Sequence, residues 1–481
     1  MVKKFLSFLL NNKTFIFLFL IFFLFSQNVF SHGLNVRYEL PIPIYLYLIF
    51  SSLVIVITIF FVKFVKFSKS IKMSAKIPEA RRSQYNYSFI QNFSLLIFIF
   101  LIISGLLGSQ ESLKNIINVF FWVWIWVGVA YLSIIFGNIW ADINPWNKLY
   151  SLFLYYFRSK IKKYRRHSKV EVEIIGLIIL VLFMWFAMVS PYREVPQLLS
   201  FLFIMYFFIT FIGMIFYGRN RWFSYAEIFN IYFGMLGRLS IFSRSNKNLI
   251  KNFRMPFSGV NKGSGSFFSA LFIVFAVSSI SYDGILETAF WYNIKNFLIS
   301  VSYIQDFFRA LGLNYNTLNV LLDSLGFFIV LIIFCSLFLL TCFRSKNNIL
   351  KLSSKNLFIA FSPALIPIAA AYLIAHYFSF LLIAGQLIFI LISDPLGLGW
   401  NLFGTANHQI NVYILNVKLG WGIILASVVI GHIFSVIISH KIAYEITNNI
   451  KEGFQVHLPF SIFMVFYTVF SLYILAQPIV H

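Results

Sequence analysis

Acidic residues are scarce in this chain. Of its 481 residues only 15 are Asp or Glu, against 38 Lys or Arg, and charged residues make up 11% of the total. Soluble globular domains carry about 25% charged residues, whereas here 60% of the residues are hydrophobic and 20% are aromatic. These proportions exclude a soluble globular protein and indicate a membrane protein.

Cysteine and familiar catalytic motifs are also lacking. The two cysteines, Cys335 and Cys342, fall seven residues apart in one expected helix, about 10 Å along its axis, which is too far for a disulfide. No CxxCH motif is present, so covalent haem attachment is excluded. The hydrolase signatures HExxH and GxSxG are absent as well, and Asp283 and Glu287 are expected in an outer loop.

Long apolar runs dominate instead. A helix needs about 20 apolar residues to cross a hydrocarbon core about 30 Å thick. We therefore predict an all-α polytopic transmembrane helical bundle of about ten helices. These are expected near residues 42–65, 88–107, 115–136, 172–190, 196–217, 264–281, 318–343, 363–392, 419–440 and 459–477.

The first 31 residues resemble a signal peptide. Lysines stand at the start, a short apolar core covers 14–25 and a small-residue cleavage site ends at Ser31. Because the core is short, we expect cleavage in preference to an uncleaved first membrane helix. Residues 32–481 are then expected to form a single transmembrane helical domain.

Basic residues are divided unevenly among the expected loops. Segments 63–87, 138–171, 218–263, 344–356 and 441–458 hold 29 of the 38 Lys and Arg residues, while the alternate segments hold six. The positive-inside rule places the richer set in the cytoplasm. We therefore expect a bacterial inner-membrane protein with both mature termini outside. The net charge of +23 then reflects topology, and nucleic acid is not an expected partner.

Two of these loops are expected to contain further helices. Segment 221–242 mixes apolar and polar residues at helical spacing and is expected to lie flat at the membrane surface. Segment 282–316 is long enough for one or two short helices on the outer side.

Two histidines stand at membrane depth in the stretch 375–441. His376 and His432 each lie about two residues from the middle of consecutive expected helices, so both imidazoles are expected at one depth. Ionisable groups inside a membrane tend to mark function. Two facing histidines suit a copper ion, a zinc ion or a haem iron. Structural hydrogen bonding in a packed interface and a proton relay are the alternatives.

Two other histidines are expected outside the membrane. Cleavage after Ser31 would leave His32 at the N-terminus, where its amine and imidazole suit a copper ion; the alternative is that it simply follows the cleavage site. His408 comes after the Gly- and Pro-rich loop 393–406, within expected reach of His32. His440 is expected to be solvated at the cytoplasmic interface.

Five stretches together carry a family resemblance. They are SHGLNVRYELPIPIYLYL at 31–48, GNIWADINPWNKLY at 137–150, YGRNRWFSYAEIFNIYFGMLGR at 217–238, SISYDGILETAFW at 279–291 and most of 375–441. In this order they resemble a family of polytopic bacterial membrane proteins, mostly uncharacterised, some of which carry the name fenitrothion hydrolase. The resemblance implies organophosphate ester hydrolysis, which generally uses a metal-activated water. It carries over no catalytic residue.

The sequence thus predicts a membrane protein that holds a metal ion or haem between its eighth and ninth helices. Copper or haem is the expected cofactor, and the expected role is metal transport, metal delivery or electron transfer. The alternatives are a membrane-bound hydrolase of the organophosphate type and a structural or assembly subunit without a site. The lipid bilayer is the expected partner in each case.

Overall fold

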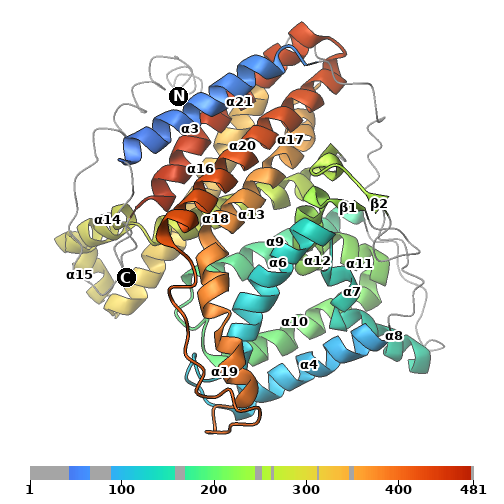
Figure 1. Ribbon diagram of the computed structural model, residues 1–481, viewed down its shortest axis with the longest axis vertical. Helices are drawn as coiled ribbons and strands as arrows, with labels where there is room; N and C mark the ends of the chain where they lie inside the picture. The colour runs from blue at the N-terminus through green and yellow to red at the C-terminus, as the bar shows by residue number, and fades with distance from the viewer. Residues whose placement is uncertain are drawn as a thin grey trace.

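The fold is a helical bundle, seen in a computed structural model (Figure 1). The structure describes residues 43–65, 88–157, 168–243, 252–261, 265–310, 312, 314–345 and 352–477. Within these residues ten helices are long and apolar enough to cross a membrane, so the predicted all-α polytopic bundle is confirmed. The expected signal peptide and His32 lie outside the described residues.

Ten helical segments form the spans. In chain order they are α3 (Ile44–Val62), α4 (Ser88–Leu107), α5–η1–α6 (Ile116–Asn118, Val119–Gly128 and Val129–Phe136), α9 (Lys169–Val189), α10 (Pro196–Tyr217), α13 (Phe267–Leu286), α16 (Tyr315–Ser345), α17–η5–α18 (Ser354–Phe361, Ser362–Leu365 and Ile366–Ala384), α20 (Val417–Thr447) and α21 (Ile450–Leu475).

Short elements connect the spans. They are α7 (Trp140–Ile143), α8 (Pro145–Phe157), α11 (Arg219–Tyr225), α12 (Ile228–Leu236), η3 (Gly237–Leu239), η4 (Ser258–Asn261), α14 (Ala289–Ser300), α15 (Ser302–Ala310), α19 (Leu387–Ser393) and the antiparallel pair β1 (Phe242–Ser243) and β2 (Asn252–Phe253). The prediction of one or two short helices within 282–316 is confirmed by α14 and α15, at the left of Figure 1.

The most enclosed spans are α13 and α17–η5–α18. Of their most apolar stretches, 72% and 89% of the residues are buried inside the protein, against 17% for α3. Both lie in the middle of the bundle in Figure 1, while α3 runs along its edge beside α20 and α21. A polar residue on α13 or α18 is therefore shielded from lipid by neighbouring helices.

The last two spans form a tight hairpin. Only Asn448 and Asn449 separate α20 from α21. Asn448 adopts the left-handed conformation with φ 55°, which asparagine tolerates better than most residues. The side chain of Asn449 accepts a hydrogen bond from the backbone nitrogen of Lys451 at 3.0 Å and so caps α21. Consequently α21 begins nine residues earlier than the predicted 459.

The segment 221–242 packs against other helices of the bundle, and its predicted orientation flat at the membrane surface stays a prediction. Its aromatic residues Trp222, Phe229 and Phe233 are buried, and α12 packs against α6, α9 and α18. The third span contains a ten-residue π-helix, η1, a rare conformation. Trp126 of η1 stacks on Tyr232 of α12 with ring centroids 4.8 Å apart, so the aromatic content of both segments serves the same interface.

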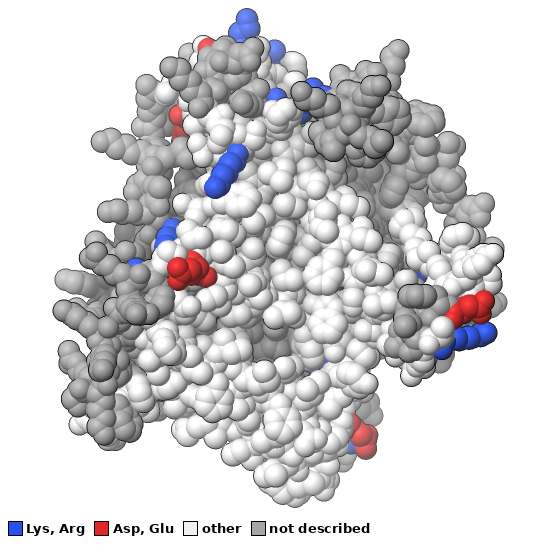
Figure 2. Space-filling view, turned by 180° about the vertical axis from the view of Figure 1, so that it is seen from behind, with Lys and Arg blue, Asp and Glu red and all other residues white. Residues whose placement is uncertain are grey.

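The outer surface matches a lipid environment. Figure 2 shows a broad face of uncharged residues, with most of the visible charged side chains toward its margins. Side chains such as Phe60, Phe61 and Ile332 are more than half exposed on the spans. Large exposed apolar surfaces are unfavourable in water, so this chain is a multi-pass membrane protein.

Candidate functional site: a buried aspartate–histidine pair

His376 pairs with a carboxylate from a second central helix. Its Nε2 atom on α18 lies 3.1 Å from Oδ2 of Asp283 on α13, and the two side chains are only 10% and 14% exposed. Oε2 of Glu287, which is 39% exposed, lies 4.0 Å from the same nitrogen. An unpaired charge would be costly at a buried position. The imidazole and the carboxylate therefore stabilise each other within the bundle.

Two tyrosines complete the surroundings of this pair. The hydroxyl of Tyr377 donates to the same Oδ2 atom of Asp283, and its ring meets that of His376 edge-on at 4.7 Å. The ring of Tyr372, one turn earlier on α18, stacks beside His376 at 6.2 Å. The carboxylate oxygen thus has two donors, and the imidazole contacts two aromatic rings.

A glycine allows α13 and α18 to approach at this point. A Cβ atom on Gly284 would collide with the hydroxyl of Tyr372 and lie 2.8 Å from Cγ2 of Ile474 on α21. Small residues allow close approach of membrane helices. The prediction that Asp283 lies in an outer loop was wrong, because α13 extends to Leu286 and not to residue 281.

His432 is held by different groups. Its Nδ1 donates to the carbonyl of Val428 on its own helix at 2.8 Å, and its ring lies 5.6 Å from that of Tyr467. Its Nε2 is buried and has no hydrogen-bond partner among the described residues. Tyr467 in turn bonds Ser281 on α13 at 2.5 Å. His432 therefore faces a polar region that reaches the helix of Asp283.

The predicted metal or haem site between His376 and His432 stays a prediction. Within the described part of the chain, no group of three or more His, Cys, Asp or Glu residues is arranged to hold a metal ion. His376 has a carboxylate partner, whereas His432 keeps one nitrogen unbonded. His408 lies exposed in the loop before α20, with its ring 5.5 Å from Phe389. His32, which is predicted to lie near His408, falls outside the residues that the structure describes.

A second histidine pair was missed in the sequence. His440 is buried and not solvated, and its ring lies 5.1 Å from that of His457 on α21. The Oγ atom of Ser461 lies 2.8 Å from Nε2 of His457. The predicted start of α21 at residue 459 places His457 in a loop. The earlier helix start is what brings the two rings together.

A buried carboxyl at the start of α12 was missed as well. Glu227 is fully buried and accepts hydrogen bonds from Tyr206 at 2.7 Å, from the indole of Trp140 at 3.2 Å and from the backbone nitrogen of Asn230 at 2.7 Å. Burial raises the pKa of Glu227 from 4.5 to about 7, although these hydrogen bonds act in the opposite direction. The sequence feature that could have indicated this site is a single acidic residue within the aromatic run WFSYAEIF.

The arrangement around Asp283 is suited to proton exchange. Tyr377, Asp283 and His376 form a continuous series of hydrogen-bonding groups, and the carboxylate and the imidazole each have a site for the exchanged proton. Glu287 is the most exposed acidic group in contact with the pair. Scans against protein-family models, curated proteins and solved structures find no match to this chain.

Proposed function

We propose that this protein belongs to a bacterial inner membrane and uses the Asp283–His376 pair to bind and release a cation during transport or relay across the bilayer. The proton is the simplest such cation. The observation that supports this role is the position of the pair on the two most enclosed spans. Ionisable residues are expensive there and usually belong to proton or ion pathways.

Charge balance explains why a cation would exchange at this position. With His376 protonated, the 3.1 Å pair with Asp283 has no net charge. Loss of the proton leaves the Asp283 carboxylate without a full counter-charge in a region of low dielectric, where an uncompensated charge is unfavourable. A second cation entering near Glu287 would restore the balance. The pair would thus favour exchange of one proton for one unit of positive charge.

A bound metal ion or haem is the second candidate, with a role in metal transport, metal delivery or electron transfer. The unbonded, buried Nε2 atom of His432 favours it, since an unsatisfied buried polar atom costs about 1–3 kcal/mol. A copper ion or haem iron taking that nitrogen as a ligand would remove the cost. His376 would have to exchange its contact with Asp283 for the metal to act as the second ligand.

The family resemblance supports a third proposal, hydrolysis of organophosphate esters. In that reaction His376, oriented by Asp283, would act as a general base toward a water molecule. We rank it below cation exchange because the described residues include no three-ligand metal group to activate the water. A structural subunit without a site ranks last, since it gives no role to the buried ion pair.

Proton flux through the purified protein tests the first proposal. In liposomes with an entrapped pH-sensitive dye, an imposed cation gradient should drive proton movement in the wild type. D283N and H376Q should each lower the rate at least tenfold, because both remove the exchangeable pair. D323N is the matched control, since Asp323 forms a comparably shielded ion pair with Lys295 at 3.0 Å and should keep most of the flux.

The same preparations separate the candidates. Wild-type flux retained in both D283N and H376Q would contradict cation exchange at this pair. An absorption band of haem, or copper that is lost in both H376Q and H432Q, would favour the second candidate. Thermal unfolding of each variant shows whether a lost flux reflects lost folding.

A further inference from the structure

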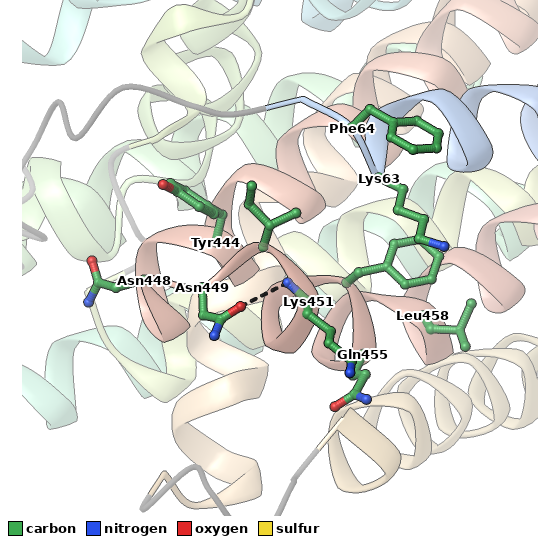
Figure 3. Close-up of a pocket in the computed structure, with 10 residues that line it drawn as sticks. Lys63, Phe64, Tyr444, Asn448, Asn449, Lys451, Gln455 and Leu458 are labelled. Carbon is green, nitrogen blue, oxygen red and sulfur yellow. Dashed lines mark hydrogen bonds between the residues drawn. The ribbon is translucent and has the colours of Figure 1, made fainter.

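A groove opens where α3 ends beside the α20–α21 hairpin. It has a volume of about 830 Å³ and is lined by Lys63, Phe64, Tyr444, Asn448, Asn449, Ile450, Lys451, Phe454, Gln455 and Leu458. Figure 3 shows the side chain of Lys63 at the end of α3 and that of Lys451 on the α20–α21 hairpin, both lining this groove. The groove is formed by the end of α3 and by the ends of α20 and α21 that meet at Asn448 and Asn449, and neither Asp283 nor His376 lines it.

The charge of the groove is of one sign. Lys63 and Lys451 are exposed and line it, whereas none of the described lining residues is Asp or Glu. Nζ of Lys63 lies 5.6 Å from the centre of the Phe454 ring, a cation–π position. Neither lysine forms an ion pair with any residue that the structure describes. The acidic neighbour Glu452 accepts a hydrogen bond from Asn449 at 3.3 Å.

The groove continues into an apolar surface. Phe60, Phe61 and Phe64 at the end of α3 are 59%, 64% and 65% exposed. These phenylalanines are neighbours of Lys63 in the sequence, and Phe64 itself lines the groove. The polar groove is therefore next to an apolar, lipid-facing surface. Lysine side chains at the ends of membrane helices extend toward the headgroup region in this manner.

We propose that this groove binds an anionic phospholipid, with its phosphate between Lys63 and Lys451 and an acyl chain along the exposed phenylalanines of α3. Charge complementarity and continuity with the lipid-facing wall identify this occupant. The basic segments that adjoin the groove in the sequence, 63–87 and 441–458, are those that the positive-inside rule assigns to the cytoplasm. Anionic lipids give the cytoplasmic leaflet its negative surface potential.

Lipid-dependent stabilisation of the purified full chain tests the proposal. Phosphatidylglycerol added to protein in a neutral detergent should raise the unfolding temperature, whereas phosphatidylcholine should raise it by less than half as much. The double variant K63M/K451M should lose at least half of the phosphatidylglycerol shift. Methionine keeps an apolar stem of similar length, so packing against Phe454 is preserved while the charge is removed.

Lys355 provides a matched control. It is exposed and lies over an aromatic ring in the same manner, with Nζ 5.3 Å from the Phe267 centroid, but it does not line the groove. K355M should retain the full lipid shift.

An unchanged shift in K63M/K451M would overturn the proposal, as would an equal loss in K355M. A shift reproduced by inorganic phosphate alone would also overturn it, because the apolar wall would then contribute nothing. If the double variant does not fold, K63Q and K451Q are compared singly in the same assay: loss of part of the phosphatidylglycerol shift supports the proposal, and an unchanged shift in both overturns it.

Discussion

At the scale of single residues, Glu227 has the most informative titration outside the spans. Its pKa is raised from 4.5 to about 7 by burial. The folded protein therefore binds this proton more readily than the unfolded chain does between those two pH values. The contribution of Glu227 to stability is therefore fully present below about pH 4.5 and is lost as the pH rises to about 7, because the folded state must then hold a buried carboxylate.

The variant E227Q should remove this pH dependence. One pKa unit corresponds to about 1.4 kcal/mol, so the wild type should lose about 3 kcal/mol of unfolding free energy between pH 4.5 and 7.5 relative to E227Q. Denaturation of both proteins in detergent at several pH values measures the difference. The exposed Glu111 supplies the control, and E111Q should follow the wild-type curve. A difference between wild type and E227Q that does not change with pH would contradict the assignment.

The two members of the candidate site differ in how far the sequence revealed them. His376 was predicted because an ionisable residue interrupts a long apolar run. Asp283 was not, because it stands near the end of α13, where a shift of a few residues decides between loop and span. Its partner lies 93 positions away in the chain, and such pairing depends on which helices become neighbours. Hydrophobicity along the chain contains no information on that choice.

At the scale of helices, the contact between α18 and α20 depends on Gly431. A Cβ atom there would lie 2.9 Å from the carbonyl oxygen of Pro367 and would also meet Cβ of Ala371. Backbone atoms cannot move away from such an intrusion without separating the helices. Gly431 therefore fixes the distance between the two helices that carry His376 and His432.

The variant G431A should destabilise the protein by about 1–3 kcal/mol, the usual range for overpacking. Gly422 lies on the same helix with nothing within 4 Å of its Cβ position, so G422A should be neutral or slightly stabilising owing to the helix propensity of alanine. Unfolding temperatures of the two variants in the same detergent measure the difference. G431A being as stable as G422A would show that α18 and α20 are not packed this closely.

The limits of several helices could be predicted from the sequence, whereas irregularities within the helices could not. The predicted limits 88–107 and 196–217 agree with α4 and α10, because apolar length determines them. The π-helix Val119–Gly128 and the break at Ser362–Leu365 before α18 were not foreseen. Pro363 lacks an amide donor, which accounts for the second. The first packs against α18, and its Trp126 stacks on Tyr232 of α12, and no local pattern specifies such long-range neighbours.

At the scale of the whole molecule, the ten spans and the distribution of basic residues together imply one topology. With residues 1–31 removed as predicted, the even number of spans among the described residues would leave both ends of the mature chain on the same side of the membrane. The positive-inside rule then predicts that this side is the outer one, because 29 of the 38 Lys and Arg residues fall in the segments 63–87, 138–171, 218–263, 344–356 and 441–458. The lipid groove would then face the cytoplasmic leaflet, and Glu287 would lie toward the outer side.

Reporter fusions test this topology. Fusions after residues 75, 160, 250 and 350 should be active with a cytoplasmic reporter, and fusions after 305 and 405 only with an exported one. The expected reason is electrostatic, because short loops rich in lysine and arginine are retained on the cytoplasmic side during insertion. Replacing basic residues of 63–87 by glutamine should weaken the preference at residue 75 first, whereas the same change at Lys418 should have no effect. An exported signal from any of the four basic segments would contradict the ten-span order, and it would also reverse the leaflet to which the groove at Lys63 opens.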